Sequence, residues 1–423
     1  MRILVSTPTF FPIVGGAELL IRDVLNVWSE QHDVRLVTPV LKAGSAPFWS
    51  DADVEATCDF EVVRFRDRVN LMDLRGHAKT KGVVPPMSLS AVPELSRQVR
   101  DFDADALVTF FGAPYGLPAA IVARRAGIPH TIVFCGTDIP SPRTAVAPVW
   151  HSYLRLAASS ADRAVYVSRF CFDALFPARR FTSPHDVVIH GGIPLAERSE
   201  REKADATRRC RELRGRLDVG DEDVMLFSLS RLGPEKRVDV LLRAFAALPP
   251  LPRRVRLVIG GQGSEADSLR ELADELGITG DVVFTGLLGA EKADYYEACD
   301  VFVFHSMFET FGQVLVEAMT AGKPVVSVRA GAIPEVVGEG EAGLLAEPAD
   351  AEDVAARIAD LVRDDDLRHE MGAAARRRVE QLFDWNAARQ RWIQLLDTEP
   401  RNEASRFATV ADRERLGAKA GSS

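Results

Sequence analysis

Cysteine is scarce in this sequence, and its placement excludes two common kinds of site. The chain has 423 residues and five cysteines. They are odd in number, scattered, and form no C-x-x-C pair, which predicts neither a disulfide framework nor a zinc site and favours a reducing compartment. The five are Cys58, Cys135, Cys171, Cys210 and Cys299.

Long apolar runs are absent as well. No stretch reaches the roughly 18 apolar residues of a membrane-spanning helix. The first residues, MRILVSTPTF, lack the apolar segment and cleavage site of a signal peptide and are typical of a buried first strand. We therefore expect a cytoplasmic protein, for which peripheral contact with a membrane stays open.

The chain also lacks an excess of positive charge. Its formal net charge is −9, and because nucleic-acid backbones attract basic surfaces, we expect no nucleic-acid partner. A small anionic ligand is still compatible with this charge, since a few local cations are enough to hold a diphosphate.

Several motifs of catalysis and metal binding are missing. The sequence contains no H-E-x-x-H, no G-x-x-x-x-G-K-[ST] and no G-x-S-x-G, which removes the common signatures of zinc proteases, P-loop enzymes and α/β-hydrolases. An acidic run at Asp101, Asp103 and Asp105 precedes a predicted strand, so it lies at the sheet edge opposite to the one that binds ligands. We expect no metal ion and no cofactor.

What the chain does contain is a regular alternation of short apolar runs and amphipathic stretches. This alternation, in both halves, predicts parallel strands joined by crossover helices. With 423 residues the chain is too long for one ordinary core. The expected fold class is α/β, with two Rossmann-like, doubly wound domains at residues 1–194 and 217–380. A polar linker at 195–216, with or without a helix of its own, joins them, and a polar tail follows at 399–423.

The apolar runs give a list of expected elements. The expected strands are 2–6, 34–37, 61–65, 106–110, 131–134, 164–167 and 187–189 in the first half, and 224–228, 255–259, 282–284, 301–304 and 324–328 in the second. The expected helices include 17–28, 117–126, 237–248, 264–276, 292–298 and 311–321. Loops that follow the strands are the places to look for a site, because ligands of open α/β sheets bind beyond the carboxyl ends of the strands.

The first such loop ends in Gly15 and Gly16, at the start of a predicted helix. Two glycines there let backbone N–H groups approach an anion closely, and the helix dipole assists. A tight turn that needs glycine at positive φ is the alternative.

The second half opens with two cations after its first strand. Arg231 follows the strand directly, and Lys236 stands at the start of the next predicted helix. A helix N-terminus is an unfavourable place for a lysine, and a bound diphosphate would remove that objection. The alternative is that both are solvated surface cations.

Two carboxylates form the strongest local signal. Glu317 lies in a predicted helix that is apolar on most sides, so its carboxylate needs partners. Glu309 precedes the same helix, whose first N–H groups at Phe311 and Gly312 can meet oxygens. Two carboxylates suit two vicinal diols, one on a ribose and one on a sugar. Complementation of the helix dipole by Glu309 and an internal ion pair of Glu317 are the alternatives.

Two glycine-containing turns carry weaker signals. Gly261 and Gly263 lie in a turn between a predicted strand and a helix, a pattern that is weak evidence by itself. Leu287 follows a strand in the run Phe-Thr-Gly-Leu, which either offers backbone groups to a base edge or is only a turn.

Taken together, these segments resemble the retaining GT-B glycosyltransferases, in the large group with an E-x7-E motif that includes bacterial phosphatidylinositol mannosyltransferases and sucrose-phosphate synthases. The resemblance covers nearly the whole chain to about Asp397. The matching segments are FFPIVGGAE, VFCGTDI, VYVS, VVIHGGI, SRLGPEKRVDVLLRAF, LVIGGQG, VVFTGLL, FETFGQVLVEAMTAGKPVV, GAIPEVV and FDWNAARQRW. The last resembles a final helix that returns to the first domain, which corresponds to residues 381–398.

The resemblance implies an activity, an architecture and roles for single residues. Two domains would face each other across a cleft, with the acceptor on the first and a nucleotide-diphosphate sugar on the second. Arg231 and Lys236 would hold the diphosphate, Glu317 the ribose and Glu309 the transferred sugar. The remaining donor contacts would come from Gly15, Gly16, Gly261, Gly263, Leu287, Phe311 and Gly312. Transfer would retain the anomeric configuration and need no metal.

One position departs from the family pattern. Cys135 stands where the family commonly has histidine, in the run Phe-Cys-Gly-Thr followed by Asp138. One interpretation is that both residues contact the sugar or the acceptor, so that the change puts the choice of sugar in doubt. The alternative is a neutral packing substitution at Cys135, with Asp138 taking over the contact.

The sequence leaves the acceptor and two other activities open. UDP is favoured as nucleotide by family frequency, and the hydroxyl acceptor is a glycan, a glycolipid or a secondary metabolite. Its contacts are expected in loops at 70–86 and 112–117. A nucleotide-sugar epimerase or hydrolase on the same fold and a non-catalytic nucleotide-sugar-binding subunit are the alternatives.

Overall fold

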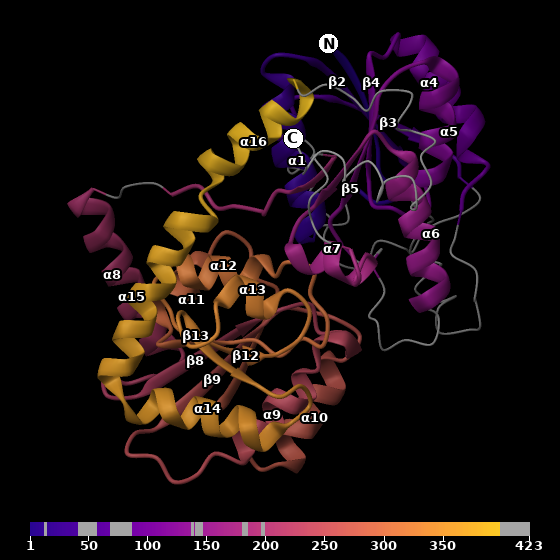
Figure 1. Ribbon diagram of the computed structural model, residues 1–423. Coiled ribbons are helices and arrows are strands. Elements are labelled where there is room, and N and C mark those ends of the chain that lie inside the picture. The colour runs from indigo at the N-terminus through magenta and orange to yellow at the C-terminus, as the bar shows by residue number, and fades with distance from the viewer. Residues whose placement is uncertain are drawn as a thin grey trace, which may run out of the picture. The chain divides into compact units, whose positions relative to one another are not determined.

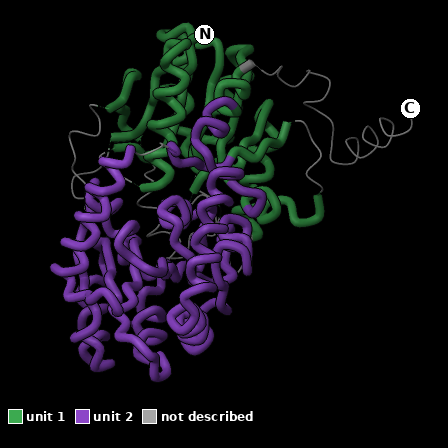
Figure 2. The backbone as a smooth tube through the Cα atoms, turned by 90° about the vertical axis from the view of Figure 1, so that its left-hand side faces the viewer, with its two compact units in different colours: residues 1–167, 171–189, 391–423 green, residues 168–170, 190–390 purple. Residues whose placement is uncertain are grey.

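The computed structural model describes residues 1–11, 15–40, 57–67, 87–136, 139, 147–179, 185–195 and 199–397. The described residues form two compact units, which Figure 2 draws in two colours. Unit 1 consists of the described residues up to Val167, those of 171–189 and those from Arg391 to Asp397. Unit 2 consists of Ser168–Phe170 and the long stretch from His190 to Gln390.

Unit 1 is built on one parallel sheet with the strand order β3-β2-β1-β4-β5-β6-β7 (Figure 1). The strands are β1 (Arg2–Ser6), β2 (Asp33–Pro39), β3 (Glu61–Phe65), β4 (Ala106–Phe110), β5 (His130–Phe134), β6 (Arg163–Tyr166) and β7 (Asp186–Val188). Leu4 of β1 is in register with Arg35 on one side and Leu107 on the other. The order of strands therefore reverses at β1, and such a switch point is where open sheets bind ligands.

Helices cover both faces of this sheet, with α4, α5 and α6 side by side on one face (Figure 1). The helices are α1 (Gly16–Ser29), α4 (Ala91–Phe102), α5 (Gly116–Ala126) and α6 (Ala147–Ser160). Two further helices, α7 (Arg169–Leu175) and α16 (Trp385–Asp397), begin in unit 2 and end in unit 1. Trp28 of α1 and Trp392 of α16 are both buried and meet edge to face, with 6.2 Å between ring centroids. This aromatic pair holds the last turns of α16 in unit 1.

Unit 2 is built on a second parallel sheet, with the order β10-β9-β8-β11-β12-β13. The strands are β8 (Val224–Leu229), β9 (Val255–Gly260), β10 (Val282–Gly286), β11 (Val301–Val303), β12 (Val325–Val328) and β13 (Gly343–Ala346). Here the order reverses at β8, which pairs with β9 and β11. The strands are almost continuous runs of buried apolar residues, as expected for a sheet covered on both faces.

The helices of unit 2 fall into two layers. In one, α9 packs against α10 and α14, and in the other α8 packs on α11 and α12 on α15 (Figure 1). The elements are α8 (Glu200–Arg216), the 3-10 turn η1 (Pro234–Lys236), α9 (Val238–Ala246), α10 (Ala266–Glu275), α11 (Lys292–Ala298), α12 (Gln313–Thr320), α13 (Ile333–Val337), α14 (Ala351–Arg363) and α15 (Asp365–Leu382). No helix in the described part of the chain is long and apolar enough to cross a membrane.

Local signals in the sequence explain where several of these helices begin. Ser199 and Glu202 form a capping box at the start of α8, with Glu202 Oε2 accepting from the Ser199 N–H at 2.8 Å. Asp350 caps α14 and Asp364 caps α15 by accepting N–H groups of the first turn. The acidic residues therefore start helices where the free N–H groups need acceptors.

The predicted fold class, α/β with two Rossmann-like parallel-sheet domains, is confirmed. Every predicted strand overlaps an observed one, and the pattern missed only the short β13 among the strands of the described residues. The helix predicted from Arg237 begins one residue later, because Arg237 has a φ of 47° and separates η1 from α9.

The units divide the chain at other places than the predicted domains do. The segment expected as a linker, 195–216, contains α8, which packs on α11 and is part of unit 2. The chain leaves unit 2 within α16, between Gln390 and Arg391. The predicted tail at 399–423 lies outside the described residues.

Candidate active site

Unit 2 gathers most of the predicted site residues at one edge of its sheet. Arg231 follows β8, Gly261 follows β9, Leu287 follows β10 and Glu309 follows β11. These four strands are hydrogen-bonded neighbours in the order β10-β9-β8-β11 and run parallel, so the loops at their carboxyl ends adjoin each other. The two glycine turns, the two cations and the two carboxylates are therefore parts of one edge.

Lys236 and Glu309 form an ion pair at this edge. The Lys236 Nζ lies 2.5 Å from Glu309 Oε1 and 5.6 Å from the centroid of the Phe304 ring. The two charged side chains are only 18% and 14% exposed. Lys236 is thus no solvated surface cation, because its ammonium group is enclosed by a carboxylate and an aromatic face.

Arg231 also has a carboxylate partner, the side chain of Glu235 four residues on. Burial alone would raise the pKa of Glu235, but the charges of Arg231 and Lys236 and the hydrogen bond from Arg231 outweigh burial and lower this pKa. The loop from Arg231 to Lys236 therefore combines two cations with one anion and leaves the Arg231 side chain 35% exposed.

Both oxygens of Glu317 are held by α11. Lys292 Nζ donates to Oε1 at 2.7 Å, and the Tyr296 hydroxyl donates to Oε2 at 2.8 Å. Burial and the negative charge of Glu317 raise the pKa of Tyr296 well above its ordinary value, so it remains a donor. The internal ion pair foreseen as an alternative for Glu317 is present, yet a carboxylate oxygen has a second lone pair for a ligand hydroxyl.

Sequence reasoning missed Lys292 and Tyr296. Their spacing of four residues places both on one face of α11, and this was the available signal. Nothing in the sequence showed that this face lies against α12, because that contact depends on the packing of two helices far apart in the chain.

The glycines of the turn after β9 are required by close packing. A Cβ on Gly261 would lie 1.8 Å from the Ser230 carbonyl oxygen, and one on Gly263 would lie 2.1 Å from that of Leu232. The Leu232 N–H donates to the Gln262 carbonyl at 2.8 Å. These glycines therefore hold the turn against the loop that carries Arg231, a structural reason that involves no ligand.

The loop between β11 and α12 ends at a position whose backbone conformation favours glycine. Gly312 has a φ of 91° and precedes α12, and its carbonyl accepts the N–H of Leu315 at 2.9 Å. The neighbouring Phe311 is buried. Leu287, the remaining predicted contact of unit 2, directly follows Gly286, whose carbonyl accepts the N–H of Gly261 at 2.7 Å.

In unit 1, Gly15 caps α1, and Gly16 is its first residue. The φ of Gly15 is −146°, so a positive φ is not the reason for glycine here. A Cβ on Gly15 would instead lie 2.8 Å from Oε2 of Glu18, a buried carboxylate that accepts the Thr9 hydroxyl at 2.8 Å. Sequence reasoning missed Glu18, which reaches back to the helix N-terminus.

The other candidates of unit 1 are less completely described. Cys135 follows β5 directly and is buried, at 6% exposure. Asp138 and the loop at 70–86 lie outside the described residues. In the loop at 112–117, a Cβ on Gly112 would lie 2.4 Å from the Phe134 ring, so glycine allows this loop to pack on β5.

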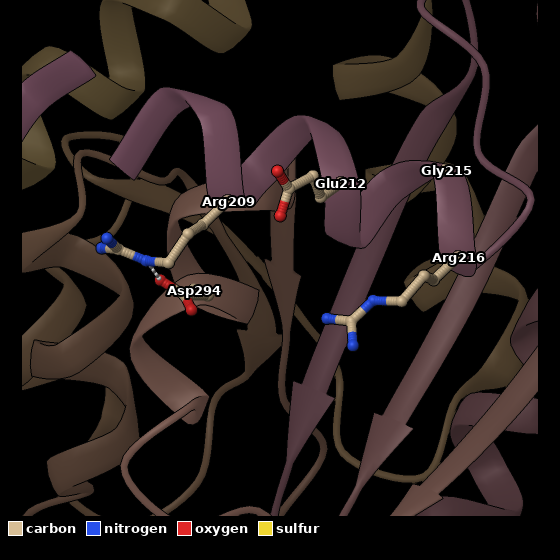
Figure 3. Close-up of a pocket in the computed structure, with 5 residues that line it drawn as sticks. All are labelled: Arg209, Glu212, Gly215, Arg216 and Asp294. Carbon is tan, nitrogen blue, oxygen red and sulfur yellow. Dashed lines mark hydrogen bonds and ion pairs between the residues drawn. The ribbon is translucent and has the colours of Figure 1, made fainter. Parts of the chain in front are cut away.

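An open depression of about 640 Å³ lies between α8 and α11. Figure 3 shows its lining residues Arg209, Glu212, Gly215, Arg216 and Asp294. Arg209 and Asp294 pair across 2.8 Å as half-exposed surface groups, and none of the predicted site residues lines the hollow. In the described part of the chain, no three His, Cys, Asp or Glu side chains gather as metal ligands would. We therefore take the carboxyl edge of unit 2 as the candidate site.

Two protein families match this chain. Residues 15–192 match the family described as "Glycosyl transferase 4-like domain", and residues 211–378 match "Glycosyl transferases group 1". The second match contains the cations and both carboxylates of the candidate site.

Curated relatives are moderately similar. A sulfoquinovosyl transferase of Arabidopsis thaliana is 30% identical over 314 residues, which are 72% of this chain and 58% of that protein. A GDP-mannose-dependent alpha-(1-6)-phosphatidylinositol monomannoside mannosyltransferase of Mycolicibacterium smegmatis is 28% identical over 93% of this chain and 97% of that protein.

Solved structures share the fold. The HepE protein of Anabaena in complex with UDP superposes with a TM-score of 0.75 at 24% identity, over 94% of this chain and all of that one. A sucrose-phosphate synthase from Thermosynechococcus elongatus gives a TM-score of 0.70 at 18% identity, over 94% and 98% of the two chains. At these identities the likeness concerns the fold, a GT-B fold of two Rossmann-like domains.

Proposed function

Because the chain carries a glycosyl transferase 4-like domain and a group 1 glycosyl transferase domain, we propose that it transfers a sugar from a nucleotide-diphosphate sugar to an acceptor hydroxyl, with retention of anomeric configuration. The observation that carries this proposal is the edge of unit 2 at which Lys236 pairs with Glu309 and the carboxylate of Glu317 is oriented by α11. The spacing of Glu309 and Glu317 is that of the E-x7-E motif.

The charges at this edge suit the parts of such a donor. Arg231 and Lys236 supply positive charge to the diphosphate, and Lys236 can keep Glu309 while it donates its other N–H groups to phosphate oxygens. Glu309 takes hydroxyls of the transferred sugar, and Glu317 takes the ribose hydroxyls. Phe311 and Gly312 offer backbone N–H groups, Gly261, Gly263 and Leu287 line the donor, and Gly15 and Gly16 approach the diphosphate from unit 1.

In the proposed reaction, the bond between the anomeric carbon and the diphosphate oxygen breaks while the acceptor oxygen bonds to the same face of that carbon. The acceptor proton passes to the departing phosphate oxygen. Arg231 and Lys236 stabilise the charge that develops on the leaving diphosphate, so the contribution of the protein is positioning and electrostatic stabilisation. We propose that no metal ion or other cofactor takes part.

The donor and the acceptor are proposed by class. UDP is the favoured nucleotide, supported by the UDP complex of the Anabaena protein, while the mycobacterial relative is named as GDP-mannose-dependent. An acceptor in glycan or glycolipid synthesis is supported by the names of relatives such as an alpha-monoglucosyldiacylglycerol synthase of Streptococcus pneumoniae. A lipid acceptor would bring this cytoplasmic enzyme into peripheral contact with a membrane. Cys135 and Asp138 are proposed to meet the sugar or acceptor.

The test is a panel of UDP- and GDP-sugars screened for thermal stabilisation of the purified chain. A ligand at 100 times its dissociation constant adds about 2.7 kcal/mol of stability. Hits are then incubated with and without glycan and glycolipid acceptors, and the anomeric configuration of the product is read by NMR. A changed donor sugar without transfer would favour an epimerase. Release of the sugar without an acceptor would favour a hydrolase, and binding without turnover would favour a non-catalytic subunit.

A further inference from the structure

Glu335 in α13 has a half-buried carboxylate, 24% exposed, that the proposed reaction does not use. Its Oε1 accepts the N–H of Arg169 at 2.8 Å and lies 2.9 Å from His190 Nε2, and its Oε2 accepts the N–H of Phe170 at 2.9 Å. Burial raises the pKa of Glu335, but the hydrogen bonds from His190 and the two backbone N–H groups outweigh burial and lower it. The carboxylate is therefore a charged acceptor shared by three donors.

The two segments that Glu335 joins are the ones that hold the loop after β11. Ser168, next to Arg169, donates its hydroxyl to the Thr310 carbonyl at 2.6 Å. The His190 ring stacks on the Phe311 ring, with 6.0 Å between centroids and 18° between planes. Glu335 is thus linked to Thr310 through the segment of Ser168 and to Phe311 through His190.

The loop itself is held one residue at a time. The Glu309 carbonyl accepts the Ala332 N–H at 2.8 Å, one residue before α13 begins. The Thr310 carbonyl is held by Ser168, and the Phe311 ring packs so closely on Gly191 that a Cβ there would lie 2.9 Å from it. Three consecutive residues, the first of which is the proposed sugar-binding carboxylate, are therefore fixed from three different segments.

These contacts have one common organiser. Ala332 immediately precedes α13, the helix that carries Glu335. Ser168 precedes Arg169, whose N–H donates to the Glu335 carboxylate, and the His190 ring contacts the same carboxylate. Removing that carboxylate would free two backbone N–H groups and one imidazole at once, while the donor-side ion pairs of Lys236 and Glu317 would keep all their partners.

We propose that Glu335 is a positioning residue that sets the geometry of the Glu309–Gly312 loop through Ser168 and His190. The inference rests on the proposed function in so far as this loop binds the transferred sugar. Nucleotide binding depends on Arg231 and Glu317 and is independent of Glu335. The loop geometry therefore controls the rate of transfer rather than the affinity for the nucleotide, since small misplacements of reacting groups reduce the rate strongly.

The experiment compares Glu335→Gln and Ser168→Ala with two matched controls, Glu347→Gln and Ser268→Ala. The Glu347 carboxylate pairs with Arg329 and is 64% exposed. The Ser268 hydroxyl donates to the carbonyl of Glu265, three residues earlier. The first readout is hydrogen–deuterium exchange of the amides at 309–312. The second is kcat on the best donor of the UDP- and GDP-sugar panel, beside the Kd of the matching nucleoside diphosphate.

We expect exchange at 309–312 to become at least about tenfold faster in both variants and kcat to fall at least about tenfold, with the nucleotide Kd changed less than about twofold and the controls like the wild type. Unchanged exchange in both variants overturns the inference, and so does faster exchange with unchanged kcat. If the wild type transfers no sugar, the proposed function fails, and the exchange measurement alone still decides whether Glu335 positions the loop.

Discussion

The hydroxyl of Tyr296 donates to Glu317 across 2.8 Å from a ring that is 3% exposed. A buried phenol on a carboxylate fixes the plane of that carboxylate, and the second donor, Lys292, fixes its other oxygen. Glu317 is therefore oriented before any ligand binds, as a group that receives a ribose diol needs to be.

This relationship predicts the effect of Tyr296→Phe. Loss of one hydrogen bond of about 1 kcal/mol should raise the nucleotide Kd roughly fivefold, while kcat at saturating donor stays within about twofold. Calorimetric titration with UDP and GDP gives the Kd. Tyr295→Phe is the control, because Tyr295 is the neighbouring tyrosine of α11 and its ring packs on Phe227 of β8. Equal Kd values for all three proteins would show that the orientation of Glu317 does not matter for binding.

Gly263→Ala should destabilise unit 2. The new methyl group would lie 2.1 Å from the Leu232 carbonyl oxygen, so the loop that carries Arg231 has to shift, at a cost of about 1–3 kcal/mol. Gly280→Ala is the matched control, since a Cβ there meets nothing within 4 Å. Differential scanning calorimetry of both variants checks this, and equal melting temperatures would contradict the close approach.

The buried side chain of His305 should make the folded protein less stable in mild acid. Burial lowers the pKa of this histidine from 6.5 to about 4, and neither ring nitrogen has a hydrogen-bond partner within the described residues. The unfolded chain takes up a proton near pH 6.5 and the folded chain only near 4, so the stabilisation is complete above 6.5 and is lost as the pH falls to 4. The loss amounts to at most about 3 kcal/mol.

His305→Gln should therefore flatten the dependence of stability on pH. Urea denaturation between pH 7 and 4, followed by a probe in unit 2, measures the slope for both proteins. His130 of unit 1, whose pKa burial also lowers to about 4, is present in both proteins, so the slope of unit 1 should be the same in both and serves as the internal reference. A slope in unit 2 that is identical in both proteins would assign the acid sensitivity to other groups.

Transfer should proceed without a divalent cation. Arg231 pairs with Glu235 and Lys236 with Glu309, but both cations keep further N–H groups for the proposed diphosphate. We propose that these donors, rather than a metal ion, stabilise the leaving group. The check is the initial rate in excess EDTA and after addition of magnesium or manganese. We expect rates within about twofold of each other. Activity that disappears in EDTA and returns with either ion would be incompatible with this reaction scheme.

The sequence predicted the sheets well because their strands are short, strongly apolar runs. It did not predict β13, whose four residues give too little pattern, or the packing of α8 on α11, because the polar face of α8 is typical of a linker. For the site, it identified the groups that carry charge. Their partners Lys292, Tyr296 and Glu235 were missed, and so was Glu18 beside Gly15, because such contacts depend on how helices and loops pack.

The glycines show a second limit of sequence reasoning. Gly261 and Gly263 suggested a turn that approaches a ligand, and the structure shows that they approach the backbone of the neighbouring loop. A glycine in the sequence indicates that something approaches the backbone closely, but it does not indicate what. A ligand and a neighbouring backbone segment both require the absence of a side chain there.

The most direct test of the proposed transferase is the release of nucleoside diphosphate from the best donor of the UDP- and GDP-sugar panel, measured for the wild type and for Glu309→Gln with and without acceptor. The account predicts acceptor-dependent release by the wild type and a rate at least about a hundredfold lower for the variant, because a charge-assisted contact made at the reacting sugar is lost. No release by the wild type from any donor, or equal rates for the two proteins, would contradict it.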